Sequence, residues 1–183
     1  TGTLLVPNVI TGTGTLTIDC PINSGTVVLS GVNSFTGTVT VSSGTLRITN
    51  SNALGATLPA ANKTIGLNAG TAGNCQLRLD GSGGDIDLPS NIRYNTSNPS
   101  GAIFNESGNN IIRGNITCTT GGGDTRVSVV AGTLTLQGNI APNATSRNFV
   151  MAGVGTGFSN GVISNGTAVL GLGRPTEPMR VSP

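Results

Sequence analysis

The chain has 183 residues and a formal net charge of +2; only 9% of its residues are charged, and none is histidine. These features exclude the basic stripe of a nucleic-acid-binding protein and the usual Ser-His-Asp or Cys-His nucleophile pairs, and no apolar run approaches the roughly 20 residues of a membrane span. Glycine, with 29 residues, and abundant threonine, serine and asparagine instead favour short strands and turns, so we expect an all-β fold.

Strand-like alternation begins in the first segment, 1–12, where Pro7 interrupts it. Further alternating segments mostly open on Gly-Thr or Gly-Ala, and they lie at 14–22, 25–31, 37–43, 44–50, 85–89, 101–108, 126–130, 132–140 and 161–173. Turn-rich pieces separate several of them, at 80–85, 96–101 and 119–124. We find no capped segment with a helical period, and 51–56 could form at most one helical turn.

The same opening and the same alternation recur along the chain, and this recurrence distinguishes a β-solenoid from a sandwich or a barrel. Strands of a sandwich differ in role and pattern, whereas each coil of a solenoid occupies an equivalent place and repeats the same turn and strand chemistry. We therefore predict a single β-solenoid domain over residues 1–183, with about seven to eight coils of about 20–30 residues each.

The segment 31–55, GVNSFTGTVTVSSGTLRITNSNALG, has the composition of one repeat unit. Side chains two residues apart share one face of a strand. We therefore expect a turn at 42–44 between two faces, with a core-facing set and an outward-facing set. The core-facing residues are Val39, Val41, Leu46 and Ile48, and the outward ones are Thr38, Thr40 and Arg47.

Residues 25–55 closely resemble the autotransporter-associated β-strand repeat, also called the passenger-associated transport repeat. In that repeat a GTLTLSG-like strand precedes an N-x-[YF]-[TS]-G-x-T element, a GTLxL strand and a closing N-x-x-ALG. The matching residues here are Asn33, Phe35, Thr36, Gly37, Thr38, Gly44, Thr45, Leu46, Asn52, Ala53, Leu54 and Gly55. The stretch 101–118, GAIFNESGNNIIRGNITC, resembles a second motif of the same group. The resemblance implies a right-handed parallel β-helix that is secreted or displayed on a bacterial surface.

Three cysteines, Cys20, Cys75 and Cys118, each lie in phase with apolar neighbours two residues away. This spacing predicts buried thiols that behave as small hydrophobic side chains. A disulfide between Cys75 and Cys118 is the alternative if their strands stack next to each other. Their wide spacing and the lack of histidine do not match a zinc motif.

Carboxylates are the remaining candidates for chemistry. Asp85 and Asp87 alternate with apolar residues, and Asp80 and Asp124 lie in turns, so we interpret all four as solvent-facing. Two alternatives stay open. The piece DGSGGDID is similar to part of a calcium-binding nonapeptide and makes Asp80, Asp85 and Asp87 a weak calcium candidate. The same residues with Arg78 could instead line a carbohydrate-binding or carbohydrate-active groove. We expect no catalytic residue and no cofactor.

The two ends carry no recognisable cap, and the chain begins without a methionine or a signal peptide. We therefore expect either a segment of a longer rod or a subunit that pairs end to end with other copies of itself. The leading hypothesis is a non-enzymatic extracellular stalk or fibre. The alternatives are a carbohydrate-binding or carbohydrate-active β-helix and an adhesin that binds host or environmental glycans through loops at 89–101 or 141–160.

Overall fold

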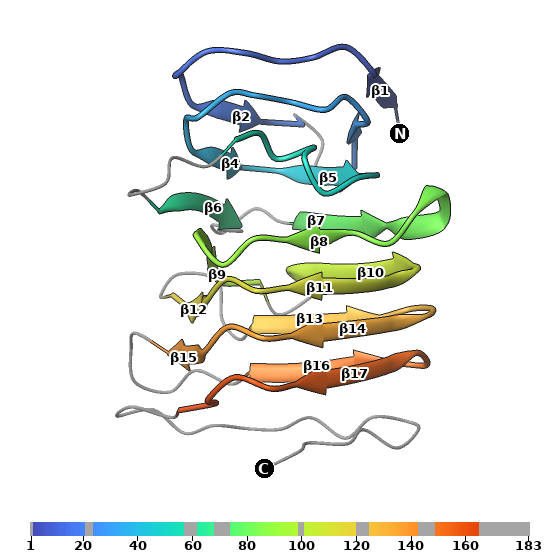
Figure 1. The fold of residues 1–183 in the computed structure, drawn as a ribbon, viewed down its shortest axis with the longest axis vertical. Helices are drawn as coiled ribbons and strands as arrows, with labels where there is room; N and C mark the ends of the chain where they lie inside the picture. The colour runs from blue at the N-terminus through green and yellow to red at the C-terminus, as the bar shows by residue number, and fades with distance from the viewer. Residues whose placement is uncertain are drawn as a thin grey trace.

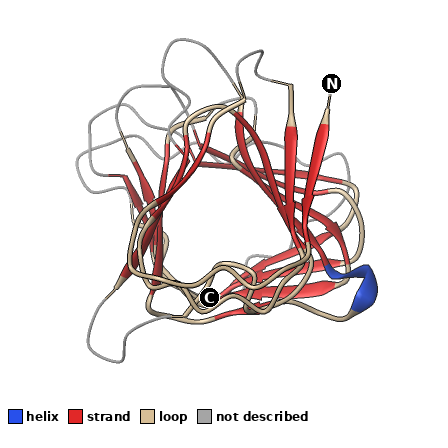
Figure 2. Ribbon diagram, turned by 90° about the horizontal axis from the view of Figure 1, so that it is seen from above, coloured by secondary structure: helices blue, strands red, loops and turns tan. Residues whose placement is uncertain are grey.

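The computed structural model describes residues 2–20, 24–56, 62–67, 74–98, 101–119, 125–142 and 149–164. Their strands stack as successive coils along one axis (Figure 1). Viewed along that axis, the strands form walls around a common interior (Figure 2). A short 3₁₀ turn, η1 (Gly81–Gly83), projects at one corner, and the described residues contain no α-helix. No helix among them is long and apolar enough to cross a membrane.

Three parallel sheets form the walls. The first sheet has seven strands in the order β1 (Thr3–Val6), β3 (Thr26–Leu29), β5 (Gly44–Ile48), β7 (Cys75–Asp80), β10 (Ile103–Ser107), β13 (Thr125–Val129) and β16 (Phe149–Gly153). The second sheet has six, in the order β2 (Leu16–Ile18), β4 (Val39–Val41), β6 (Lys63–Leu67), β9 (Ile92–Thr96), β12 (Ile116–Cys118) and β15 (Ile140–Pro142). The third sheet has four, namely β8 (Asp87–Leu88), β11 (Asn109–Ile112), β14 (Thr133–Leu136) and β17 (Thr156–Ser159).

This topology confirms the predicted all-β parallel solenoid. Five strands of the first sheet lie between its edge strands β1 and β16, so about five turns have a neighbour on both sides. Equivalent positions in adjacent coils lie 23 residues apart at Thr15 and Thr38, 24 apart at Asn115 and Asn139, and 31 apart at Thr45 and Gln76. The right hand and the count of seven to eight coils stay predictions.

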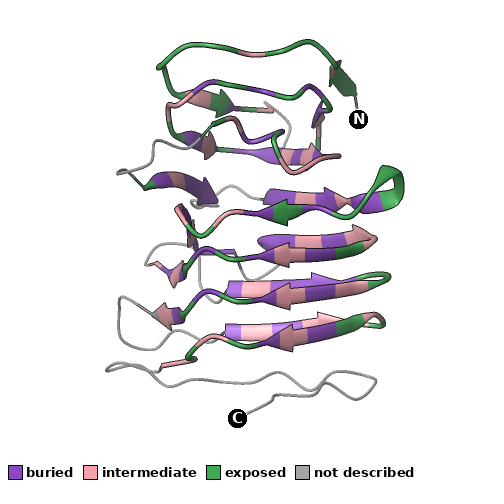
Figure 3. Cartoon of the chain, viewed as in Figure 1, coloured by how far each residue is buried: buried purple, intermediate pink, exposed green. Residues whose placement is uncertain are grey.

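Alternation along each strand separates the core from the surface (Figure 3). In the segment 31–55, the four apolar side chains at 39, 41, 46 and 48 are buried, while Thr38 is exposed and Thr40 and Arg47 are half-buried. The core continues through every coil because each inward residue lies over its partner in the next one, as Leu46 over Leu77 and Leu77 over Ile103. Each fully buried aliphatic side chain contributes roughly 1.5–3 kcal/mol to the stability of the fold.

Two segments that we expected to be loops contain strands of the solenoid walls, so the expectation of loops throughout these ranges was wrong. The range 89–101 contains β9, which pairs with β6 and β12. The range 141–160 contains β16 and β17, which continue the first and third sheets. Their serine-, asparagine- and glycine-rich composition obscured the alternation, although Tyr94 and Phe149 are both buried. Most of the strand expected at 161–173 lies outside the described residues.

Glycines at one corner allow the coils to approach closely. A Cβ added to Gly138 would overlap the carbonyl oxygen of Gly114, and one added to Gly161 would overlap that of Gly138. Gly37 meets Gly14 in the same way near the other end of the stack. Backbone lies against backbone at these positions, so no flexible side chain can move aside to make room.

We expect Gly138→Ala to destabilise the fold by about 1–3 kcal/mol, because the added methyl group would push two coils apart. The control is Gly83→Ala, since a Cβ at Gly83 has open space around it. Urea unfolding followed by circular dichroism measures both variants. Equal midpoints for the two would contradict the close packing at this corner.

Candidate functional site

The first of the repeat-motif residues, Asn33, joins neighbouring coils through its side-chain amide. The backbone N–H of Ile10 donates to Asn33 Oδ1 over 2.8 Å, and Asn33 Nδ2 donates to the carbonyl of Ala53 over 2.6 Å. The Asn33 side chain is buried, so its two polar atoms need partners within the protein, and these two backbone groups provide them. The amide suits this place because it both donates and accepts.

Asn105 and Asn110 do the same in the second motif. Asn110 Nδ2 donates to Asn105 Oδ1 over 2.7 Å, and Asn110 Oδ1 accepts the N–H of Ile86 over 2.7 Å. Asn105 Nδ2 donates to the carbonyl of Ala131 over 2.7 Å in the following coil. The two buried amides therefore connect three consecutive coils. Sequence reasoning noted the motif but not this role.

Lys63 is the side chain that sequence reasoning most plainly missed, although it lies two and four residues before Ile65 and Leu67, a spacing that places all three on one face of a strand. It is only 3% exposed, and its Nζ donates to the carbonyl of Phe35 over 2.9 Å. The same nitrogen lies 3.7 Å from the centroid of the Phe35 ring. Burial lowers the pKa of Lys63 to about 8.

The remaining repeat-motif residues form turns, core and an outer row. Gly44 and Gly55 have φ values of 79° and 80°, a region that favours glycine. The carbonyl of Asn52 accepts the N–H of Gly55 over 2.9 Å and closes the turn, while Leu46 and Leu54 are buried. On the outside, Thr38 Oγ1 lies 3.0 Å from Thr15 Oγ1. Gly37 approaches the backbone of Gly14, and Thr45 faces outward.

The three cysteines are free thiols, so the structure contains no Cys75–Cys118 disulfide. Cys75 and Cys118 are buried, whereas Cys20 is partly buried with its sulfur over Gly44. Cys75 Sγ donates to the carbonyl of Ser42 over 3.0 Å. Burial, together with the charge of Asp19, raises the pKa of Cys75 to about 11, which keeps this thiol protonated and unreactive at neutral pH.

The carboxylates of the calcium candidate take separate partners. Asp80 accepts from Ser107 and Ser82, Asp85 accepts from the N–H of Asn109, and Asp87 binds the guanidinium of Arg113 with both oxygens. The part of the chain that the structure describes contains no group of three or more His, Cys, Asp or Glu side chains placed to hold a metal ion. Asp124 lies outside the described residues.

Asp80 and Arg78, two residues of the proposed carbohydrate groove, belong to one charged network on the outer face of the first sheet, joined through Arg47 and Glu106. Arg47 Nη2 lies 2.9 Å from Asp80 Oδ2, and Arg47 Nε lies 2.7 Å from Glu106 Oε2. Arg78 Nη1 lies 2.8 Å from Glu106 Oε1. Sequence reasoning did not connect Arg47 and Glu106 with this charged network, although both alternate with buried residues of their strands.

Two further contacts orient the network. Arg78 donates to Gln76 Oε1 from Nε and Nη2, and its guanidinium lies 4.5 Å from the centroid of the Phe104 ring. Burial alone would raise the pKa of Asp80, but hydrogen bonds from Ser107 and Ser82 and the charge of Arg47 outweigh it and lower the pKa. Asp80 therefore stays ionised near neutral pH and does not suit the role of a general acid.

A polar groove of about 450 Å³ lies beside the charged network. Hydroxyl groups of Thr3, Thr26 and Thr45 line one part of it, with the side chains of Arg47, Arg78 and Glu106 along another part. The groove crosses five successive strands of the first sheet, from β1 to β10.

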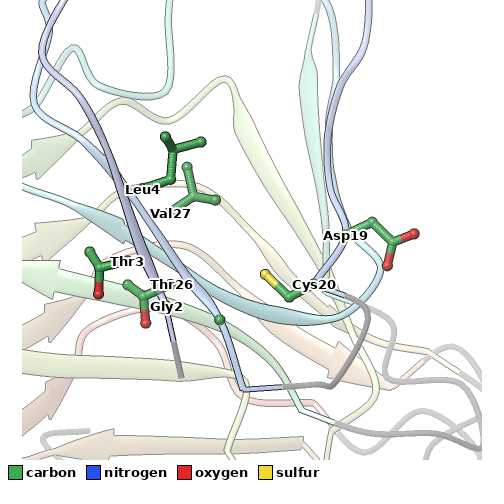
Figure 4. Close-up of a pocket in the computed structure, with 8 residues that line it drawn as sticks. Gly2, Thr3, Leu4, Asp19, Cys20, Thr26 and Val27 are labelled. Carbon is green, nitrogen blue, oxygen red and sulfur yellow. The ribbon is translucent and has the colours of Figure 1, made fainter.

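A second hollow, of about 430 Å³, lies at the β1 end of the stack (Figure 4). Leu4 and Val27 lie together on one side of it, Cys20 points its sulfur inward, and the carboxylate of Asp19 points away. Leu4 is 60% exposed although its register partner Val27 continues the inward row toward Leu46. Among the described strands, this hollow is therefore the open end of the apolar core.

Comparison with known proteins finds a family match for one stretch of the chain. Residues 22–48 match the passenger-associated-transport-repeat. The match confirms the resemblance for β3, β4 and β5 with the turns between them, and this repeat is typical of autotransporter passenger domains, which are generally surface-exposed or secreted. No curated protein and no solved structure matches the chain.

We expect Asn33→Ala to lower the free energy of unfolding by about 1–3 kcal/mol, because the N–H of Ile10 and the carbonyl of Ala53 lose their partner. The control is Asn115→Ala, whose side chain also accepts a backbone N–H, that of Asn139, but at an exposed position. Thermal and urea unfolding measure both. If Asn115→Ala lowered the free energy of unfolding as much as Asn33→Ala does, burial would not be the reason for the effect at Asn33.

Lys63 makes stability depend on pH. Because its folded pKa is about 8 and its unfolded pKa is 10.5, the unfolded chain binds more protons between these values, and stability rises with pH across that window. We expect wild type to gain stability relative to Lys63→Met between pH 8 and pH 10.5. Urea unfolding of both proteins over this range measures the difference in their free energies of unfolding. Other groups titrate alike in the two proteins, so their contributions cancel in this difference. A difference in free energy of unfolding that does not change with pH would contradict the lowered pKa of Lys63.

Proposed function

We propose that the chain is a non-enzymatic extracellular structural protein, a right-handed β-solenoid of about seven to eight coils that serves as a stalk or fibre subunit. The observation that carries this proposal is the use of the repeat-motif residues. Asn33 bridges coils, Leu46 and Leu54 fill the core, and Gly44 and Gly55 form turns. A motif whose side chains are engaged in joining coils supports a role that depends on the rod itself.

The open end supports assembly with other copies. Strand β1 pairs with β3 alone among the described strands, so the N–H and C=O groups along its other edge are available to a further strand. Leu4, which lines the apolar hollow, is 60% exposed. A second copy of this chain, added end to end, would cover both features and extend the rod.

An alternative role in glycan binding, as an adhesin or a carbohydrate-binding β-helix, is favoured by one observation. The charged network and the polar groove lie on the same outer face of the first sheet. This role is compatible with a stalk, because the groove lies along the side of the rod.

We expect the purified chain to form end-to-end rods at high concentration, and Leu4→Lys to prevent this because a charge in the apolar hollow opposes burial. The control is Val130→Lys, which adds the same charge at a 48% exposed site after β13, a strand with a neighbouring coil on each side. Light scattering after size-exclusion chromatography and negative-stain electron microscopy measure assembly. A wild-type chain that stays monomeric at every concentration would refute the proposed end-to-end assembly.

A further inference from the structure

The hydroxyl row of the polar groove is defined by strand register. Thr3 pairs with Thr26, and Thr26 pairs with Thr45, so three outward threonines follow one another on adjacent strands. Adjacent strands are about 4.8 Å apart, and the hydroxyls therefore form a ladder with that spacing. Each hydroxyl can donate and accept a hydrogen bond.

The charged row runs beside this ladder and is held rigidly. Arg47 pairs with Arg78 in register, and Glu106 contacts both guanidinium groups, one with each carboxylate oxygen. The Phe104 ring supports Arg78. Side chains that are already fixed by such contacts lose little conformational freedom when a ligand binds.

The charges of this site determine which ligands it accepts. The two guanidinium groups face two carboxylates, those of Asp80 and Glu106, so the network is balanced. An anion would have to compete with these carboxylates, and a cation with the arginines. The polar lining gives an apolar ligand little to contact. A neutral ligand with many hydroxyl groups can bond to the threonine hydroxyls and to the accessible polar atoms of the network without displacing any ion pair.

We propose that the polar groove binds a neutral saccharide, with Thr26, Thr45 and Glu106 among its contacts. The volume of about 450 Å³ lies in the range of small-molecule sites, about 300–1,000 Å³, and accommodates a short oligosaccharide. This inference deepens the alternative role in glycan binding. It needs one chain only, so it holds whether or not the chains assemble into rods.

The test uses the full chain and a panel of neutral trisaccharides, namely maltotriose, cellotriose and chitotriose, with a galacturonate trimer as the acidic probe. Saturation-transfer NMR detects binding, and isothermal titration calorimetry measures affinity. We expect at least one neutral trisaccharide to bind, more tightly than the acidic trimer. Thr45→Val and Glu106→Gln should each weaken that binding about tenfold or more.

Two variants on the third sheet are the matched controls. Thr135→Val makes the same substitution on β14, and Asp87→Asn breaks a comparable ion pair, with Arg113. Both should bind the trisaccharide as wild type does. Circular dichroism confirms folding, and Thr45→Val, which conserves side-chain volume, decides the result if Glu106→Gln fails to fold.

Three outcomes would overturn the proposal: no neutral trisaccharide binds, both groove variants bind as wild type, or the acidic trimer binds more tightly than every neutral one. If Leu4→Lys abolishes rod formation but still binds the saccharide, saccharide binding is independent of end-to-end assembly.

Discussion

Parallel backbone pairing between successive coils is the constraint on which the rest of the structure depends. It holds neighbouring strands about 4.8 Å apart and places each residue against its equivalent in the next coil. A side chain therefore meets the same two neighbours along the axis whatever its chemistry. Leu46 and Leu77 continue the core, Thr26 and Thr45 continue a hydroxyl row, and Arg47 and Arg78 lie side by side.

Stacking also explains which polar residues the interior contains. Where the chain turns between sheets, some backbone groups point away from the strand ladders, and a buried group without a partner is costly. Asn33, Asn105 and Asn110 provide those partners by reaching from one coil to the next. Lys63 also provides such a partner, because its amino group donates to the carbonyl of Phe35, and burial of that amino group lowers its pKa.

The fold could be predicted from the sequence because a short repeating pattern determines it. Alternation at Val39, Val41, Leu46 and Ile48 is local, and so are the turn glycines. The partners of Arg47 could not be predicted, because they depend on which residues the coil lengths bring into register. Those lengths vary, from 19 residues between Thr26 and Thr45 to 31 between Thr45 and Gln76. The phase of Lys63 with Ile65 and Leu67 was a local signal for an inward position, but its partner Phe35 lies in another coil. The glycine- and asparagine-rich composition also hid β9, β16 and β17 within expected loops.

The exposed asparagines on the second sheet's side have a consequence for how such a protein changes length. Asn115 accepts the N–H of Asn139, 24 residues later, and Asn139 accepts that of Val162, 23 residues later. Asn139 thus donates its backbone N–H to the preceding coil and offers its side-chain oxygen to the following one. An in-frame tandem duplication of one such unit would insert a coil whose contacts are already provided. Rods of different length can therefore arise through single recombination events, without redesign of any surface.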